Sequence, residues 1–183
     1  MDIAAALRQV LGEVRGVLEQ VEPGPVARLL DAVASAQRIY VAGEGRSGLV
    51  ARTFAMRLVH LGFTAYACGE TITPAIGAGD LCIACSGSGA TPITCHRATQ
   101  SHRVGATVAA IVAAPGTALG SSADFEVVLP APTKPSEQPA SRQFGATLFE
   151  QALLLFLDAV VLLLQERSGA SVESMRAKHT NLE

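Results

Sequence analysis

The sequence predicts one α/β domain, in which helices cover both faces of a parallel five-stranded sheet and a helical arm precedes it. Short apolar stretches alternate with helical patterns from residue 38 onward, which is typical of parallel strands joined by crossover helices. A strand, a Gly- and Ser-rich loop and a helix occur in this order twice. The length of 183 residues fits a single domain. We therefore expect an arm over residues 1–37 and a three-layer, doubly wound domain over residues 38–183.

The order of the elements follows from the hydrophobic periodicity and from the Gly and Pro residues that interrupt it. Pro92 suits the first turn of the helix that it begins. A polar loop with four prolines, residues 130–142, separates the last strand from a long apolar helix. The expected helices cover residues 3–21, 26–36, 49–60, 92–104 and 144–167, with a short one from residue 171, and the expected strands cover residues 38–42, 63–67, 80–85, 106–112 and 125–129.

The charge balance argues against two broad classes of protein. There are 14 Lys and Arg residues against 16 Asp and Glu residues, which gives a net charge of −2. Disordered chains combine low hydrophobicity with high net charge, whereas 49% of this chain is hydrophobic and 16% is charged. A near-neutral balance without a basic run also argues against nucleic acid as the main partner.

The mean hydropathy of +0.35 indicates either a membrane segment or extra apolar surface that is buried between copies of the chain. The most apolar stretch, residues 152–164, contains Asp158 and is shorter than the ~20 residues that span a membrane. The N-terminus lacks the apolar core of a signal peptide. We therefore expect a cytoplasmic homo-oligomer with no membrane partner.

Cysteines are few, and we interpret them as small buried hydrophobic residues. A chain of this size with four cysteines does not indicate a disulfide framework. Cys82 and Cys85 form a C-x-x-C pattern, which in other contexts indicates zinc or a redox pair. Here the pattern lies in an expected strand, where residues three apart point to opposite faces. The two sulfur atoms therefore cannot share a metal ion.

Two polar loops follow neighbouring expected strands, and in doubly wound sheets such loops line the ligand crevice. Residues 43–48 fit the G-x-G-x-x-G dinucleotide pattern, and Glu70 stands where a ribose-binding acid would be. A dinucleotide would leave the second loop unexplained, and the chain has no room for a separate catalytic domain. The second loop places hydroxyls among glycines at a helix N-terminus, which suits a sugar phosphate. A serine-rich turn with capping hydroxyls is the simpler alternative. The loop hydroxyls are those of Ser86, Ser88 and Thr91.

These loops and several further segments resemble the sugar isomerase (SIS) domain and, within it, the 6-phospho-3-hexuloisomerase family. The resemblance implies a flavodoxin-like or Rossmann-like fold from about Tyr40 to the end of the chain. Glu44, Ala90 and Pro92 depart from the usual pattern of the family. The matching segments are residues 45–50, 55–62, 69–76, 86–91, 148–153 and 179–183.

The resemblance implies interconversion of D-arabino-hex-3-ulose 6-phosphate and D-fructose 6-phosphate through a cis-enediol, in the ribulose monophosphate pathway of formaldehyde fixation. It implies functional pairing with 3-hexulose-6-phosphate synthase, and we expect no cofactor and no metal. Alternative functions are a non-catalytic sugar-phosphate sensor, another phosphosugar aldose–ketose isomerase and a nucleotide-binding module. The expected substrate-binding residues are Gly45, Arg46, Ser47, Glu70, Ser86, Gly87, Ser88, Gly89 and Thr91.

The expected catalytic residues are Glu150, His60 and His179. Glu150 lies early in an apolar helix and is the best proton-transfer base, although an acid there also complements the helix dipole. His60 ends the helix after the first loop, where a histidine is often only a favourable cap. Arg46 could contact phosphate or Glu70.

The long apolar helix, residues 144–167, indicates an interface between copies of the chain, because one subunit with one sheet cannot cover all of it. The resemblance implies a tetramer built as a dimer of dimers. It also suggests that His179 of one subunit completes the site of another.

Overall fold

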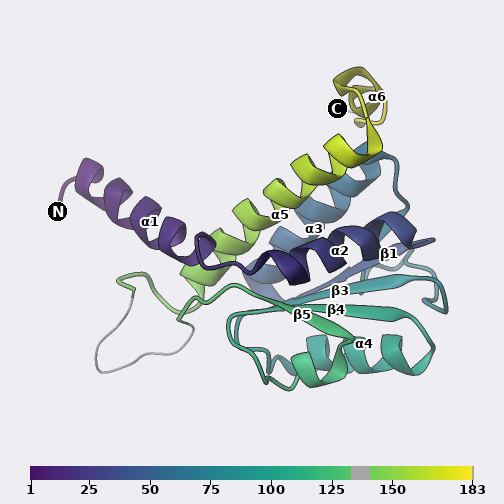
Figure 1. Cartoon of the computed structure of the whole chain (residues 1–183), viewed down its shortest axis with the longest axis horizontal. Coiled ribbons are helices and arrows are strands. Elements are labelled where there is room, and N and C mark those ends of the chain that lie inside the picture. Colours follow the sequence, from purple (N-terminus) through teal and green to yellow (C-terminus); the bar gives the residue numbers. More distant parts are fainter. Residues whose placement is uncertain (133–140, 183) are drawn as a thin grey trace.

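A single parallel sheet forms the centre of the molecule (Figure 1). The computed structural model describes residues 1–132 and 141–182, so most of the expected proline loop and the terminal Glu183 lie outside the described residues. Within that range five strands form one sheet in the order β2-β1-β3-β4-β5, and every neighbouring pair is parallel. The predicted fold class is therefore confirmed. The strands are β1 (Ile39–Ala42), β2 (Ala65–Ala67), β3 (Leu81–Ser86), β4 (Thr107–Val112) and β5 (Phe125–Val128).

Helices cover both faces of the sheet and make the outer two of the three layers. Helix α4 lies on one face, whereas α2, α3 and α5 lie on the other (Figure 1). The core is correspondingly divided into a small cluster under α4 and a larger cluster under the other three helices. The described helices are α1 (Ile3–Leu18), α2 (Pro23–Ser35), α3 (Gly45–Leu61), α4 (Pro92–Arg103), α5 (Thr147–Ser168) and α6 (Val172–Arg176), with a 3₁₀ turn η1 (Gly120–Ser122).

Helix α3 begins at Gly45, whereas the sequence predicted a loop up to residue 48. Gly45 adopts a φ of +57°, which only glycine tolerates readily, and the chain turns directly into the helix there. One turn later, a Cβ on Gly48 would collide with the carbonyl oxygen of Gly43. Because neither glycine carries a side chain, the predicted loop folds into the first turn of α3 and carries Arg46 and Ser47 with it.

The two cysteines of the C-x-x-C pattern lie on opposite faces of β3, as predicted. Cys82 packs in the cluster under α4, and Cys85 packs in the cluster under α2, α3 and α5. Both side chains are buried. Burial raises the pKa of the Cys85 thiol to about 12, so it stays protonated at neutral pH.

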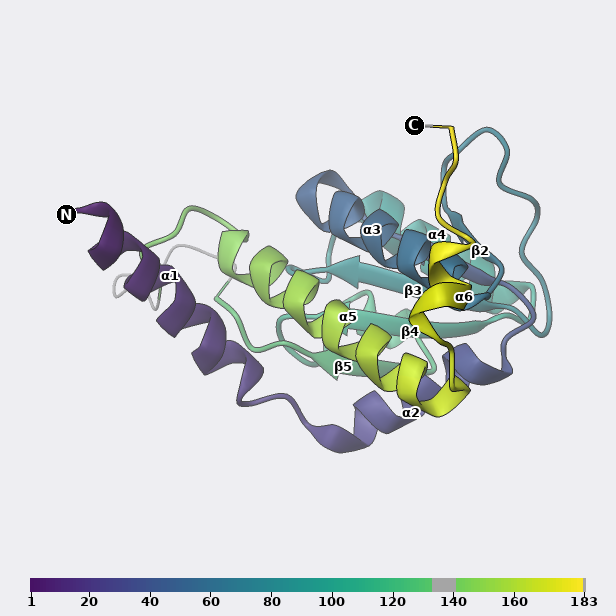
Figure 2. The ribbon, with the colours of Figure 1, turned by 90° about the horizontal axis from the view of Figure 1, so that it is seen from above.

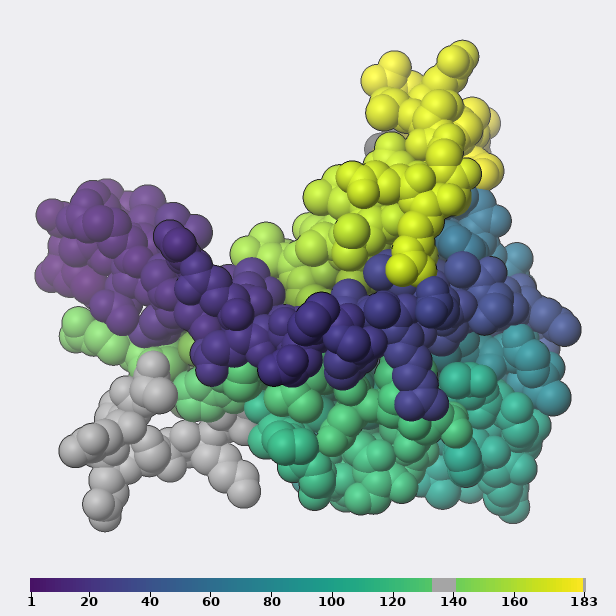
Figure 3. Space-filling view, in the orientation of Figure 1, coloured from purple at the N-terminus to yellow at the C-terminus, as the bar shows by residue number. Residues whose placement is uncertain are grey.

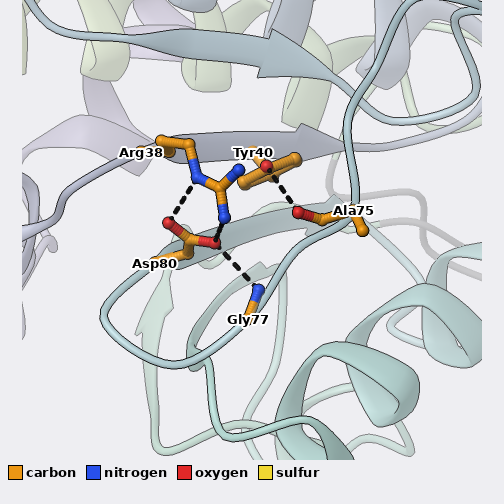
Figure 4. A network of polar contacts seen from close by, with 5 residues as sticks. All are labelled: Arg38, Tyr40, Ala75, Gly77 and Asp80. Atoms are coloured by element: carbon orange, nitrogen blue, oxygen red, sulfur yellow. Dashed lines mark hydrogen bonds and ion pairs between the residues drawn. The ribbon is translucent and has the colours of Figure 1, made fainter.

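At the edge of the sheet where the strands begin, Arg38 and Asp80 form a two-point ion pair (Figure 4). Their N–O distances are 2.9 and 2.6 Å, and the Asp80 side chain is 0% exposed. The backbone N–H of Gly77 also donates to Asp80, and the Tyr40 hydroxyl donates to the carbonyl oxygen of Ala75. Burial alone would raise the pKa of Asp80, but the bonds from Arg38 and Gly77 outweigh it and hold that pKa below its usual value. The pair ties the start of β1 to the start of β3.

Helix α1, the first helix of the expected arm, packs against α5 and projects beyond the sheet (Figures 2 and 3). Val14 and Val17 are buried there, while Ile3 and Leu7 nearer the N-terminus are exposed. Glu13 accepts hydrogen bonds from a residue one turn earlier on α1 and from the segment that precedes α5. These bonds attach α1 to that segment. Burial opposes ionisation, yet these bonds lower the pKa of Glu13 to about 2. The donors are Gln9, Ser141, Gln143 and the backbone N–H of Arg142.

Helix α5 is longer than the apolar run that the sequence showed, and by length and composition alone it could span a membrane. Half of its most apolar window is buried inside the protein, however, and it packs against α1, α2 and α3. These are the contacts of a core helix in a globular domain. The side chains of Leu155 and Leu162 remain 46% and 62% exposed, so one copy of the chain covers only part of the helix.

Candidate active site

The two polar loops lie side by side at the edge of the sheet where the strands end. Strands β1 and β3 are parallel neighbours, and Ala42 is paired with Ala84. A Cβ on Gly43 would stand 3.1 Å from the carbonyl oxygen of Cys85, so the backbones of the two loops are in close approach. The loops therefore face a common region, as expected from the sequence.

Three hydroxyl groups gather in the second loop, between β3 and α4. The Oγ atom of Ser86 lies 2.9 Å from Oγ1 of Thr91 and 3.5 Å from Oγ of Ser88. Ser86 is buried, whereas Ser88 is exposed. Gly89 has a φ of +58°, and a Cβ there would collide with Thr117, so the loop needs glycine at this position. The cluster offers uncharged donors at a helix N-terminus, where backbone N–H groups also favour an anion.

The first turns of α3, α4 and α5 have no side-chain cap among the described residues. Glu44, Thr91 and Ala146 occupy the cap positions of α3, α4 and α5, and none of their side chains accepts a hydrogen bond from its own helix. Asp2 and Ser171 cap α1 and α6, whereas α2 also begins without a side-chain cap. Uncapped N-termini leave backbone N–H groups free for a ligand.

Arg46 and Glu150 meet in the folded protein, although they are far apart in the sequence. Nη1 of Arg46 lies 3.4 Å from Oε2 of Glu150. Arg46 belongs to the first turn of α3 and Glu150 to the first turn of α5, so two helix N-termini bring them together. The Glu150 side chain is only 15% exposed, while that of Arg46 is 52% exposed. A largely buried carboxylate beside a half-exposed cation suits proton transfer next to a bound anion.

Glu70 does not contact Arg46, which was one of the expected alternatives. Its carboxylate pairs with Arg52 of α3 at 2.9 Å, and both side chains are about half exposed. A second pair, which the sequence analysis missed, joins Glu44 of the first loop to Arg97 of α4 at 2.6 Å. The sequence feature that could have predicted this pair was Glu44 itself. A carboxylate near an expected phosphate site needs a compensating cation.

His60 and His179 lie together at the opposite end of α3 from Arg46. Their rings stack with centroids 5.2 Å apart. His60 follows Arg46 on α3 at a distance of roughly 21 Å, given a helical rise of ~1.5 Å per residue. Figure 2 shows α6 beside the last turns of α3 and α5, away from the first turns that carry Arg46 and Glu150. Within one subunit, therefore, the expected base and the two expected catalytic histidines are not brought together.

The histidine pair lines a pocket of about 300 Å³. The other lining residues come from α3, α5 and α6 and include two arginines. They are Arg57, Gln165, Val172, Met175 and Arg176. The remaining histidines, His96 and His102, are exposed on α4. No group of three or more His, Cys, Asp or Glu side chains within residues 1–132 and 141–182 is arranged to hold a metal ion.

The chain is similar to known proteins along almost its whole length. It is 39% identical to the 3-hexulose-6-phosphate isomerase of Bacillus subtilis over 177 residues, which are 96% of this chain and 96% of that protein. It is 40% identical to the 3-hexulose-6-phosphate isomerase of Mycobacterium gastri over 183 residues, which are 100% of this chain and 92% of that protein.

Structural similarity leads to the same group of proteins. A crystal structure of a Methanococcus jannaschii protein, for which a molecular function of 3-hexulose-6-phosphate isomerase is inferred, superposes with a TM-score of 0.84 and 30% sequence identity. The superposition covers 98% of this chain and 99% of that one. The sequence profile of the SIS domain matches residues 32–157. The chain therefore belongs to the SIS domain family.

Proposed function

We propose that this protein is a 3-hexulose-6-phosphate isomerase that interconverts D-arabino-hex-3-ulose 6-phosphate and D-fructose 6-phosphate. The observation that carries the proposal is the contact between Arg46 and Glu150, and the hydroxyl cluster of the second loop supports an anion site near this carboxylate. Full-length similarity to proteins with this name supports the choice among phosphosugar isomerases. The reaction needs a base and a phosphate site, and these residues supply both.

The phosphate binds between Ser47 and the loop of residues 86–91. Ser86, Ser88 and Thr91 contribute hydroxyl donors, and the uncapped first turns of α3 and α4 contribute backbone N–H groups. Arg46 is half exposed and can turn from Glu150 to an oxygen atom of the substrate. Glycines at 45, 87 and 89 keep side chains away from the phosphate.

Glu150 removes the proton from C2 of the 3-ketose and returns it to C3, so the carbonyl moves from C3 to C2. Between these steps the substrate is a cis-enediol, and one hydroxyl proton must pass from O2 to O3. A single carboxylate reaches both carbons because they are adjacent. His60 and His179 transfer the hydroxyl proton from O2 to O3.

The histidines act on the substrate of a neighbouring subunit. His60 lies roughly 21 Å from Arg46 along α3, which is farther than a hexose phosphate extends. The histidine pair of one subunit therefore completes a site whose phosphate loop and Glu150 belong to another.

We propose a homotetramer built as a dimer of dimers. Helix α5 exposes Leu155 and Leu162, and the projecting arm exposes Ile3, Leu7 and Leu11 on an apolar stripe. Between the arm and α5 lies an apolar groove of about 480 Å³. Symmetric association would cover these surfaces. The pairing with 3-hexulose-6-phosphate synthase, the role in formaldehyde fixation and the cytoplasmic location belong to the same proposal.

A coupled assay tests the proposed reaction. Formaldehyde, ribulose 5-phosphate and a hexulose-phosphate synthase generate the substrate, and fructose 6-phosphate is measured with and without this protein. We expect turnover that requires the protein. A protein that fructose 6-phosphate stabilises against heat but that gives no turnover would instead be a sugar-phosphate sensor.

A mixing experiment tests the shared site. Glu150→Gln subunits and His179→Ala subunits are each inactive in the proposal, and mixed tetramers should regain part of the activity. Truncation before His179 should reduce activity without unfolding the core. A monodisperse monomer by light scattering at working concentration would contradict both the tetramer and the shared site.

A further inference from the structure

The imidazole of His60 has an asymmetric environment. The residue is 7% exposed and lies in the last turn of α3. One face of its ring stacks on His179, and the pocket of about 300 Å³ gives a small molecule access to the pair. The two ring nitrogens are therefore not equivalent, and their neighbours decide which of them carries the proton.

Arg57 contacts one of these nitrogens. Its Nη1 atom lies 3.5 Å from Nδ1 of His60, one turn away on the same helix. A guanidinium can only donate, so Nδ1 must be the acceptor in this contact. The proton of the neutral ring is then on Nε2. The contact is a long one, but a proton on Nδ1 would face a permanent cation.

The other charged groups around His60 act in the same direction. Arg176 lines the pocket, and Nζ of Lys178 approaches the end of α3 at Gly62. Among the described residues that line the pocket there is no carboxylate. Burial, then His179 and Arg57, lower the pKa of His60, against the tendency of a helix C-terminus to favour the imidazolium. The ring is therefore uncharged at neutral pH.

We propose that Arg57 is a positioning residue, which donates to Nδ1 of His60 and thereby holds that imidazole neutral with its proton on Nε2. The role in the reaction rests on the proposed function. Removal of the C2 proton leaves an enediolate, whose O3 oxyanion takes the Nε2 proton to give the enediol. The proton of O2 then returns to Nε2 as C3 is protonated, so the ring ends as it began. The negative charge that forms on the ring in between is adjacent to the Arg57 guanidinium, which stabilises it.

Nitrogen-15 NMR of the histidine rings in the full-length protein tests the contact without reference to activity. In the wild type we expect the Nδ1 signal of an unprotonated acceptor and a titration midpoint below the usual value for histidine. Arg57→Met removes the donor and the charge, so the midpoint should rise and the Nδ1–H form should appear. Arg57→Lys keeps the charge and should show a smaller change.

One control and one alternative variant make this test specific. Arg103→Met removes an exposed arginine at the end of α4, on the other face of the sheet, and should leave His60 unchanged. If Arg57→Met does not fold, Arg57→Gln serves as the second variant, because glutamine keeps a donor and removes the charge. An unaltered midpoint and unaltered ring signals in a folded Arg57 variant would overturn the proposal.

The pH profile of kcat/KM tests the role in the reaction. Activity should fall as His60 becomes protonated, so the acidic limb should move to higher pH in Arg57→Met and stay in place in Arg103→Met. A rise of one pH unit in the midpoint would reduce kcat/KM up to ~10-fold at pH values below both midpoints. If the NMR midpoint rises but the acidic limb does not move, His60 is not part of the reaction and the positioning role is overturned. The coupled assay on the wild type separates this outcome from failure of the proposed function.

Discussion

Two Arg–carboxylate pairs lie at opposite edges of the same sheet. They differ in bond length, in burial and in the elements that they join. Arg38 and Asp80, where the strands begin, make two short bonds, and the carboxylate is 0% exposed (Figure 4). Arg46 and Glu150, where the strands end, approach only to 3.4 Å, and the arginine is half exposed. The first pair joins two neighbouring strands, whereas the second joins two helix N-termini.

The difference shows how one fold separates stability from chemistry. At the first edge the acid also accepts a backbone bond from Gly77, so its bonding capacity is used within the protein. At the second edge the hydroxyl loop and the uncapped helices keep donors available for a ligand. We therefore expect variants of the first pair to change stability and variants of the second pair to change activity.

The largest effect is expected for Glu150→Gln. Gln keeps the shape of the side chain but cannot accept the proton from C2, so kcat should fall by at least ~100-fold with KM little changed. Steady-state kinetics with purified 3-ketose phosphate measure this. Glu166→Gln, at an exposed position near the other end of α5, is the matched control and should retain wild-type kinetics.

A Glu150→Gln protein that turns over normally would show that another group is the base. A protein that unfolds, as judged by thermal melting, would favour the alternative in which Glu150 only complements the dipole of α5. Only loss of kcat in a folded protein supports the contrast between the two pairs.

Asp80→Asn should have the next largest effect, and on stability alone. It leaves Arg38 without its charged partner, and we expect the free energy of unfolding to fall by about 2–3 kcal/mol, since Arg38 keeps some contact with water. Asp31→Asn breaks an exposed pair with Arg167 and should cost less than about 1 kcal/mol. Denaturant unfolding measures both, and kcat should not change in either.

The pH dependence of this difference has a defined sign. The pKa of Asp80 is lower in the folded protein than its usual value, so the pair stabilises the protein fully above about pH 4. The stabilisation is lost as the pH falls below that value and the carboxylate becomes protonated. The gap between wild type and Asp80→Asn should therefore shrink in acid, and a gap that grows there would contradict the assignment.

Particular residues show why the fold was predictable from the sequence and the site only in part. The strands and the faces of Cys82 and Cys85 follow from local periodicity, which needs no knowledge of distant contacts. The contact of Arg46 with Glu150 depends on how α3 and α5 pack, and no local pattern specifies it. The stacking of His60 on His179 depends in the same way on where α6 folds back.

The hydroxyl loop should show a smaller effect, and on binding rather than on the chemical step. Ser88→Ala and Thr91→Ala each remove one hydroxyl donor of the proposed phosphate site. Each should weaken the binding of fructose 6-phosphate by ~1–3 kcal/mol, as expected for a hydrogen bond to a charged group. Isothermal titration calorimetry measures this. Ser35→Ala, at the exposed end of α2, is the control. Wild-type affinity in both loop variants would place the phosphate elsewhere.

The smallest expected effect concerns the third pair, Glu44 with Arg97, which crosses from the first loop to α4 at 2.6 Å. Arg97 balances the charge of Glu44 beside the proposed phosphate site. Glu44→Gln therefore removes a charge that is already compensated and leaves Arg97 free to attract the anion. Arg97→Gln leaves Glu44 uncompensated and should weaken phosphate binding. Because both side chains are partly exposed, each change should stay within about 1 kcal/mol, with opposite signs. Calorimetry at low salt resolves the two, and the difference should decrease as salt is added. If Glu44→Gln weakened binding as much as Arg97→Gln did, the pair would position the loop rather than balance its charge.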